Sequence, residues 1–164
     1  MLLMVLLQHL LITQKIKQQQ LILMVTIMMV ARLNYPHKDH YTVIHAVKLL
    51  KEKYGIQKKL VLLGDGPEYS KLVEFVKKNN LEEDVFFEGN HSNVQDYYSA
   101  ASVLVHASRS GEGLPTILIE AMNFGLPVVS TDTKTGPFEI IGNDKYGLLC
   151  KVGDSNGMAE ALNR

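Results

Sequence analysis

The stretch GEGLPTILIEAMNFGLPVVSTD, residues 111–132, decides the fold class of this chain. A glycine-flanked turn leads into a helix-like run that begins at Pro115, and a strand-like run follows at 127–132. Between Leu114 and Val129 almost every side chain is apolar, which is typical of a helix and a strand packed into a core. One carboxylate, Glu120, interrupts that apolar run, so we expect it to be enclosed and to need a hydrogen-bond donor.

The same alternation continues outward along the chain. Strand-like runs occur at 27–33, 59–64, 84–89, 102–108, 127–132 and 146–152. Helix-like segments separate or follow them at 39–55, 67–80, 93–100, 115–125 and 155–164. Strands that are apolar throughout and alternate with helices predict an α/β, Rossmann-like parallel sheet with helices on both faces. Ligands of such sheets bind beyond the carboxyl ends of the strands.

Composition argues against two classes of partner. Seventeen basic and seventeen acidic residues cancel, so no strong field attracts nucleic acid or an anionic membrane. The single cysteine, Cys150, cannot form an internal disulfide and is interpreted as a small buried hydrophobe. Residues 1–26 are mostly apolar, but their runs are shorter than the roughly 20 residues that cross a bilayer. We interpret 1–26 as not native to the fold, with an interfacial anchor as the lesser alternative, and 27–164 as the domain.

Two cations follow the first strand. Arg32 and Lys38 flank a turn that contains Pro36, so both side chains can reach the carboxyl edge of the sheet and bind a diphosphate. The alternative is a pair of solvated surface bases, which the spacing alone favours. His37 and His40 have no third ligand at a recognisable spacing, so we expect no metal site.

A glycine turn follows the second strand. Gly64 and Gly66 resemble the start of a dinucleotide fingerprint, but the third glycine position is occupied by Tyr69. We therefore expect a tight turn at which the backbone approaches a ligand, and no dinucleotide.

The opening stretch is more specific. Pro115 suits the first helical position, which leaves the N–H groups of Thr116 and Ile117 free for an anion. Helical side chains lean toward the helix N-terminus, so Glu120 tilts toward the same end and can accept two hydrogen bonds from a ribose diol. The alternatives are a structural pairing of Glu120 and a capping or helix-dipole role for Glu112.

Four motifs of this chain resemble those of the retaining GT-B glycosyltransferases of family 4, glycosyl transferases group 1, and they occur in the same order along the sequence. EGLPTILIE at 112–120 resembles the E-x7-E motif, and ARLNYPHKDH at 31–40 the arginine and lysine phosphate site. LVLLGDGPEYSKL at 60–72 resembles the G-x-G-P turn, and VFFEGN at 85–90 the base-side strand. The resemblance covers roughly 27–164 and implies the C-terminal, donor-binding half of a GT-B fold.

The resemblance implies a role for each matching residue. The catalytic residues would be Arg32 and Lys38, which neutralise the donor diphosphate, and Glu112, which contacts the transferred sugar. Glu120 would bind the ribose. The remaining expected contacts are Gly113, Leu114, Pro115 and Thr116 for the sugar and phosphates, Gly64 beneath the diphosphate, and Gly89, Asn90 and His91 near the base.

The implied activity is hexosyl transfer with retention, from a UDP- or GDP-sugar to a glycan or lipid-linked acceptor in bacterial surface polysaccharide synthesis. No cofactor or metal is expected, and no D-x-D sequence occurs in the chain. The implied location is the cytoplasm, at the inner face of the membrane, where the full-length enzyme can associate peripherally. An N-terminal acceptor domain is missing and the last helix is unfinished after Arg164, so we expect the isolated chain to transfer little or nothing. The alternatives are half of a nucleotide-sugar epimerase and a non-catalytic nucleotide-binding or interaction module.

Overall fold

A six-stranded parallel sheet forms the centre of the computed structural model, which describes residues 26–133 and 135–164. The strands are β1 (Thr26–Val30), β2 (Lys59–Leu63), β3 (Val85–Gly89), β4 (Val103–His106), β5 (Val128–Thr131) and β6 (Leu148–Cys150). Their order in the sheet is β3-β2-β1-β4-β5-β6. All six predicted strands are therefore confirmed. The strand order reverses between β1 and β4, which makes this pair the topological switch point where doubly wound sheets bind ligands.

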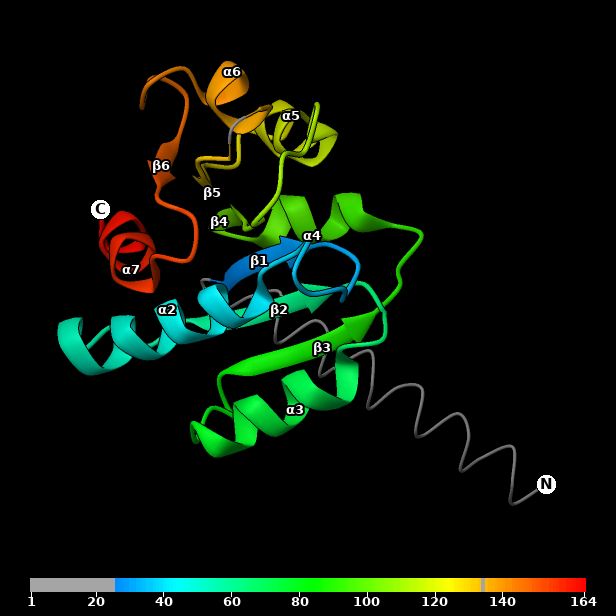
Figure 1. The fold of residues 1–164 in the computed structure, drawn as a ribbon, viewed down its shortest axis with the longest axis vertical. Helices are drawn as coiled ribbons and strands as arrows, with labels where there is room; N and C mark the ends of the chain where they lie inside the picture. Colours follow the sequence, from blue (N-terminus) through cyan, green and yellow to red (C-terminus); the bar gives the residue numbers. More distant parts are fainter. Residues whose placement is uncertain (1–25, 134) are drawn as a thin grey trace.

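Helices cover both faces of the sheet (Figure 1). They are α2 (His40–Tyr54), α3 (Tyr69–Lys78), α4 (Val94–Ala100), α5 (Thr116–Asn123), α6 (Pro137–Ile141) and α7 (Ser155–Asn163). Helices α2, α3 and α7 pack on one face, and α4, α5 and α6 pack on the other. The predicted α/β fold class is confirmed.

Two apolar cores explain why the strands carry no polar face. In β1, Ile27 and Met29 belong to the core under α2, α3 and α7, whereas Met28 belongs to the core under α4, α5 and α6. Successive side chains of a strand point to opposite faces, so a strand that is covered twice is apolar along most of its length.

Helix ends follow local signals in part. Gly55 ends α2 in the left-handed conformation, with φ of 67°, as the sequence predicts. Helix α3 begins at Tyr69, two residues later than expected, because Pro67 lies in the preceding turn. The short helix α6 was not predicted, since its five residues are too few to display a helical period.

The segment 1–25, interpreted above as foreign to the fold, lies outside the described residues. In the part of the chain that the structure describes, no helix combines the length and apolarity required to span a bilayer.

Candidate functional site

The exits of β1 and β4 are joined by a short backbone contact at the switch point. Lys38 and Ser108 form an isolated antiparallel bridge. Beside it, the N–H of Asp39 donates to the carbonyl of Ala107 over 2.9 Å. This contact fixes the loop that leads into α2 against the loop that leads into α5. It thereby brings together side chains that are distant in the sequence.

An ion pair between Arg109 and Asp39 reinforces the same contact. The Arg109 Nε lies 2.8 Å from Asp39 Oδ2, and the Asp39 side chain is fully buried. Asp39 also caps α2 by accepting hydrogen bonds from the backbone N–H and the hydroxyl of Thr42. The guanidinium of Arg109 lies over the Tyr35 ring, 5.5 Å from its centroid. Sequence reasoning missed Arg109, because an N-cap aspartate does not reveal a second partner 70 residues away.

Lys38 and Glu112 form the central charged pair of the site. The Lys38 Nζ donates to Glu112 Oε2 over 2.6 Å, and the two side chains are only 22% and 14% exposed. The hydroxyl of Ser108 donates to the other oxygen of Glu112. Both oxygens of this predicted catalytic carboxylate are therefore occupied by donors in the free chain.

His106 forms the floor beneath this pair. Its ring is 2% exposed, with Nδ1 3.1 Å from the Ser130 hydroxyl and Nε2 3.4 Å from Lys38 Nζ. The same Nε2 lies 3.8 Å from Glu112 Oε2. Sequence reasoning also missed His106, although a lone histidine that ends an apolar strand was a usable signal.

The pKa of Glu112 reflects these neighbours. Burial alone would raise the pKa of this carboxyl group, but the hydrogen bonds from the Lys38 ammonium and the Ser108 hydroxyl outweigh burial and lower it from 4.5 to about 2. Glu112 is thus a permanent carboxylate at neutral pH, and it can accept hydrogen bonds from hydroxyl groups.

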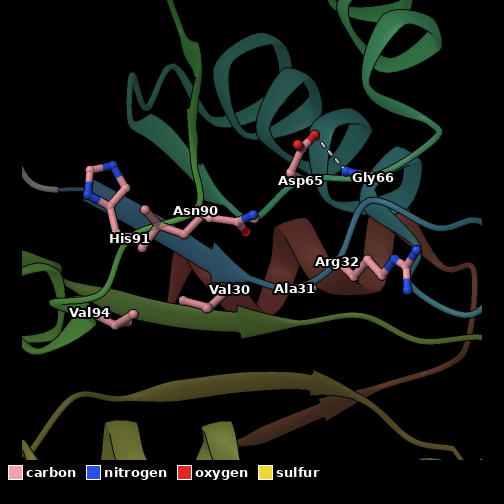
Figure 2. Close-up of a pocket in the computed structure, with 10 residues that line it drawn as sticks. Val30, Ala31, Arg32, Asp65, Gly66, Asn90, His91 and Val94 are labelled. Atoms are coloured by element: carbon pink, nitrogen blue, oxygen red, sulfur yellow. Dashed lines mark hydrogen bonds between the residues drawn. The ribbon is translucent and has the colours of Figure 1, made fainter.

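A separate open pocket of about 500 Å³ lies beyond the exits of β1, β2 and β3 (Figure 2). Four predicted site residues line it, namely Arg32, Gly64, Asn90 and His91. Figure 2 shows His91 and Arg32 at opposite ends of this pocket. The Arg32 side chain is exposed, and among residues 26–133 and 135–164 it has no ion-pair or hydrogen-bond partner. The two predicted cations, Arg32 and Lys38, thus have different surroundings.

The wall of the pocket near His91 is held by hydrogen bonds. His91 Nε2 lies 3.0 Å from the carbonyl of Glu88 and 3.2 Å from the Tyr97 hydroxyl. Gly89 ends β3 just before this wall, and its carbonyl accepts from the N–H of Gly64 over 2.7 Å. The residues expected near a base therefore form one connected rim.

Close packing explains why glycine occupies two positions of the turn after β2. A side chain at Gly64 would overlap the carbonyl of Ala31, and one at Gly66 would overlap the carbonyl of Leu33. The turn therefore needs glycine because it lies against the exit of β1, and this is the tight turn that was predicted. Both glycines also line the open pocket, so a ligand can approach their backbone.

Glu120 corrects one expectation. It lies on the exposed side of α5, whose buried residues are Leu118 and Ala121, so the prediction that the apolar run encloses it was wrong. The exposed side of the helix also carries Thr116 and the apolar Ile119. A donor is nevertheless present, because the buried Tyr98 of α4 donates its hydroxyl to Glu120 Oε2 over 3.1 Å. Burial, and then the charge of Glu120, raise the pKa of Tyr98.

The start of α5 differs from expectation by one residue. Pro115 is the N-cap and Thr116 the first helical residue, so the proline precedes the helix. Gly113 has φ of 63°, a conformation that glycine adopts without strain. Leu114 is 63% exposed, and Gly136 at the start of α6 packs against the carbonyl of Gly113.

The two histidines considered as metal ligands occupy unlike environments. His37 is exposed and hydrogen-bonds to the Ser110 hydroxyl, whereas burial lowers the pKa of His40 from 6.5 to about 4. Among the described residues, no cluster of three or more His, Cys, Asp and Glu side chains is arranged to hold a metal ion.

Comparison with known protein families shows which family this chain belongs to. The family model described as "Glycosyl transferases group 1" matches residues 13–164. The chain belongs to the glycosyl transferases group 1 family. The family resemblance inferred from the motifs is thereby confirmed at this level.

Curated relatives of this group 1 chain include two bacterial enzymes. It is 44% identical over 88 residues to the amylovoran biosynthesis glycosyltransferase AmsD of Erwinia amylovora. That alignment covers 54% of this chain and 25% of AmsD. The chain is 36% identical over 125 residues to N-acetylgalactosamine-N,N'-diacetylbacillosaminyl-diphospho-undecaprenol 4-alpha-N-acetylgalactosaminyltransferase of Campylobacter jejuni, covering 76% and 33%. The chain thus spans about a quarter to a third of these relatives.

Solved structures resemble the group 1 chain over most of its length. A crystal structure of HepE from Anabaena in complex with UDP-glucose has a TM-score of 0.81 and 25% identity, covering 91% of this chain and 41% of HepE. The C-terminal domain of the group 1 family protein LpcC from Francisella tularensis has a TM-score of 0.75 at 24% identity, covering 89% and 77%. The latter likeness concerns the fold alone.

Proposed function

We propose that residues 27–164 are the donor-binding domain of a retaining GT-B glycosyltransferase of family 4. In this proposal the domain forms the C-terminal half of the enzyme and binds a nucleotide diphosphate sugar, with a UDP-sugar favoured over a GDP-sugar. The UDP-glucose complex of HepE supports a uridine donor. The fold shared with the C-terminal domain of LpcC is consistent with this placement within the enzyme.

One observation carries the proposal. At the switch point of the sheet, the Lys38–Glu112 pair lies beyond the exits of β1 and β4, while Arg32, also beyond β1, lines an open pocket. Cations for a diphosphate and carboxylates for sugar hydroxyls thus lie along one edge of the sheet. That edge is where doubly wound folds bind nucleotides.

Each residue has a proposed role in this complex. Arg32 and Lys38 neutralise the diphosphate, and Glu112 accepts hydrogen bonds from the sugar. Glu120, directed by the Tyr98 hydroxyl 3.1 Å away, accepts hydrogen bonds from the ribose. The backbone of residues 113–116 lines the sugar and phosphates, Gly64 lies beneath the diphosphate, and the base rests near Gly89, Asn90 and His91.

The proposed chemistry is hexosyl transfer with retention. The bond from the anomeric carbon to the diphosphate breaks and the diphosphate leaves with the electron pair. The acceptor oxygen attacks the same face, and its proton passes to the departing diphosphate. The domain supplies fixed cations where negative charge develops, which is the electrostatic form of catalysis. The proposal requires no metal ion and no cofactor.

The acceptor binds to another domain in this proposal. The relatives are three to four times longer than the matched region, which supports an acceptor domain outside it. The acceptor is a glycan or lipid-linked sugar in surface polysaccharide synthesis, as the names of the Erwinia and Campylobacter relatives suggest. The full enzyme then works in the cytoplasm at the inner face of the membrane.

Titration calorimetry of the chain with UDP-, GDP- and ADP-sugars tests the proposal. We expect UDP-sugar to bind, Glu120→Ala to weaken it about tenfold through loss of hydrogen bonds to a charged group, and Glu74→Ala to leave it unchanged. Glu74 is a matched control, because it is an exposed glutamate on α3. Transfer to a defined acceptor by the chain alone would contradict the half-site proposal.

The same titrations separate the alternatives. A folded chain that binds none of the three donors would favour a non-catalytic interaction module. Binding that Glu120→Ala leaves unchanged would overturn the ribose assignment. Interconversion of a bound UDP-sugar into its epimer would favour the epimerase half.

A further inference from the structure

His106 is a buried polar residue at the end of an apolar strand, and it needs hydrogen-bond partners there. It pairs in the sheet with Ser130 of β5, and its Nδ1 lies 3.1 Å from the Ser130 hydroxyl. On its other side, Nε2 lies 3.4 Å from Lys38 Nζ. Both ring nitrogens are thus occupied, one by the core and one by the site.

The nearest neighbour of Nε2 determines which nitrogen carries the proton, because Nε2 lies closer to Lys38 Nζ, at 3.4 Å, than to Glu112 Oε2, at 3.8 Å. The Lys38 ammonium has only donors, so Nε2 must accept and Nδ1 must carry the hydrogen. The Nδ1–H then donates to Ser130, whose hydroxyl donates in turn to the carbonyl of Thr131 over 3.1 Å. The donor and acceptor roles are consistent along this row of hydrogen bonds, which runs from Lys38 to the backbone of β5. The ring therefore accepts through Nε2 in a fixed orientation.

Lys38 has three N–H donors, and the structure shows two of them in use. One donates to Glu112 over 2.6 Å and one reaches His106. The third remains for a ligand on the partly exposed side of this lysine, which is 22% exposed. If Glu112 turns to a sugar, His106 is the contact that still holds the ammonium at the edge of the sheet.

We propose that His106 is a positioning residue, which acts through Lys38 to hold the ammonium where the donor diphosphate binds. This inference rests on the proposed function. His106 does not touch the donor in this arrangement. Ser130 acts one step further out, because it fixes the proton on Nδ1 and so keeps Nε2 available to Lys38.

Calorimetry with UDP and UMP on the 164-residue chain tests the role. We expect His106→Leu to lower affinity for UDP about tenfold, the scale of one hydrogen bond to a charged group, and to change affinity for UMP much less. His106→Gln retains an acceptor near the position of Nε2, so it should recover most of the loss. Equal losses for UDP and UMP, or a Gln variant no better than Leu, would overturn the proposal.

A double-mutant cycle distinguishes positioning from a general structural effect. If His106 acts through Lys38, then His106→Leu has no further effect on UDP affinity in a Lys38→Met background. Additive losses would contradict the inference. A wild-type chain that binds no nucleotide at all would instead overturn the proposed function, so the two failures are distinguishable.

A spectroscopic measurement covers the case in which His106→Leu fails to fold. Long-range ¹H–¹⁵N spectra of the wild-type chain should show His106 as a single Nδ1–H tautomer. Ser130→Ala removes its acceptor and should produce a mixture of tautomers with weaker UDP binding. A wild-type ring that is protonated on Nε2 would overturn the proposal.

Discussion

The loop after β1 carries two cations, and they differ in what already surrounds them. Lys38 is largely covered and bound to Glu112, with His106 beneath it. Arg32 is exposed at the rim of the open pocket and has no partner among the described residues. A diphosphate therefore shares the positive charge of Lys38 with an internal carboxylate, but it meets no competitor at Arg32. The first region is preorganised and the second is adaptable.

Lys38→Met tests the preorganised region most severely. It removes a cation and also leaves Glu112 as an unpaired carboxylate beside the diphosphate. Removing one member of a covered charge pair costs several kcal/mol in binding, so we expect UDP affinity to fall about a hundredfold. Calorimetry measures this loss, and Lys38→Met with Glu112→Gln should recover part of it. A double variant as weak as Lys38→Met alone would show that the unpaired Glu112 carboxylate contributes nothing to the loss.

Arg32→Ala tests the adaptable region and should have a smaller effect. Removing Arg32 leaves no carboxylate without its partner, so only the attraction between an exposed guanidinium and the diphosphate is lost. We expect UDP affinity to fall about tenfold at low salt. Because Arg32 is solvated, the loss should shrink as salt rises toward 0.5 M, where the Debye length is about 4 Å. Lys77→Ala, an exposed cation on α3, is the matched control. A salt-independent loss would mean that Arg32 is buried in the complex.

The contrast between the two cations was not visible in the sequence. The order of strands and helices was predictable, because apolar strands and turn glycines are local signals. The positions of Arg32 and Lys38 after the same strand were predictable too. Their difference arises from a contact with Glu112, which is 74 residues from Lys38 in the chain. No local pattern encodes which carboxylate meets which lysine.

The residues that sequence reasoning missed share this property. Each of them contacts a partner that is distant in the sequence: Arg109 contacts Asp39, His106 contacts Lys38, and Tyr98 contacts Glu120. The exposure of Glu120 was missed for a related reason. An apolar helix can still have one face toward solvent, and only packing against α4 and the sheet determines which face that is.

The charged pair should also make the stability of the fold sensitive to acid. The pKa of Glu112 in the folded chain is about 2, below its ordinary value of 4.5, so the pair stabilises fully above pH 4.5. This stability is lost as pH falls from 4.5 toward 2. After allowance for solvent screening we expect Glu112 to contribute about 1 kcal/mol. Urea unfolding of wild type and Glu112→Gln should diverge above pH 4.5 and converge near pH 2, whereas Arg32→Ala should track wild type throughout.

Glu112→Gln gives the smallest effect and the sharpest test of competition. The amide keeps the shape of the side chain but releases Lys38 from its charged partner, so UDP should bind about threefold more tightly, a change on the scale of one weakened ion pair. A UDP-sugar should gain less, because the charge that accepts hydrogen bonds from the sugar is gone. The affinity for UDP-sugar divided by the affinity for UDP, both measured by calorimetry, therefore falls even though the affinity for UDP rises. If UDP binds more weakly to Glu112→Gln, then the carboxylate positions Lys38 for the diphosphate and does not compete with it.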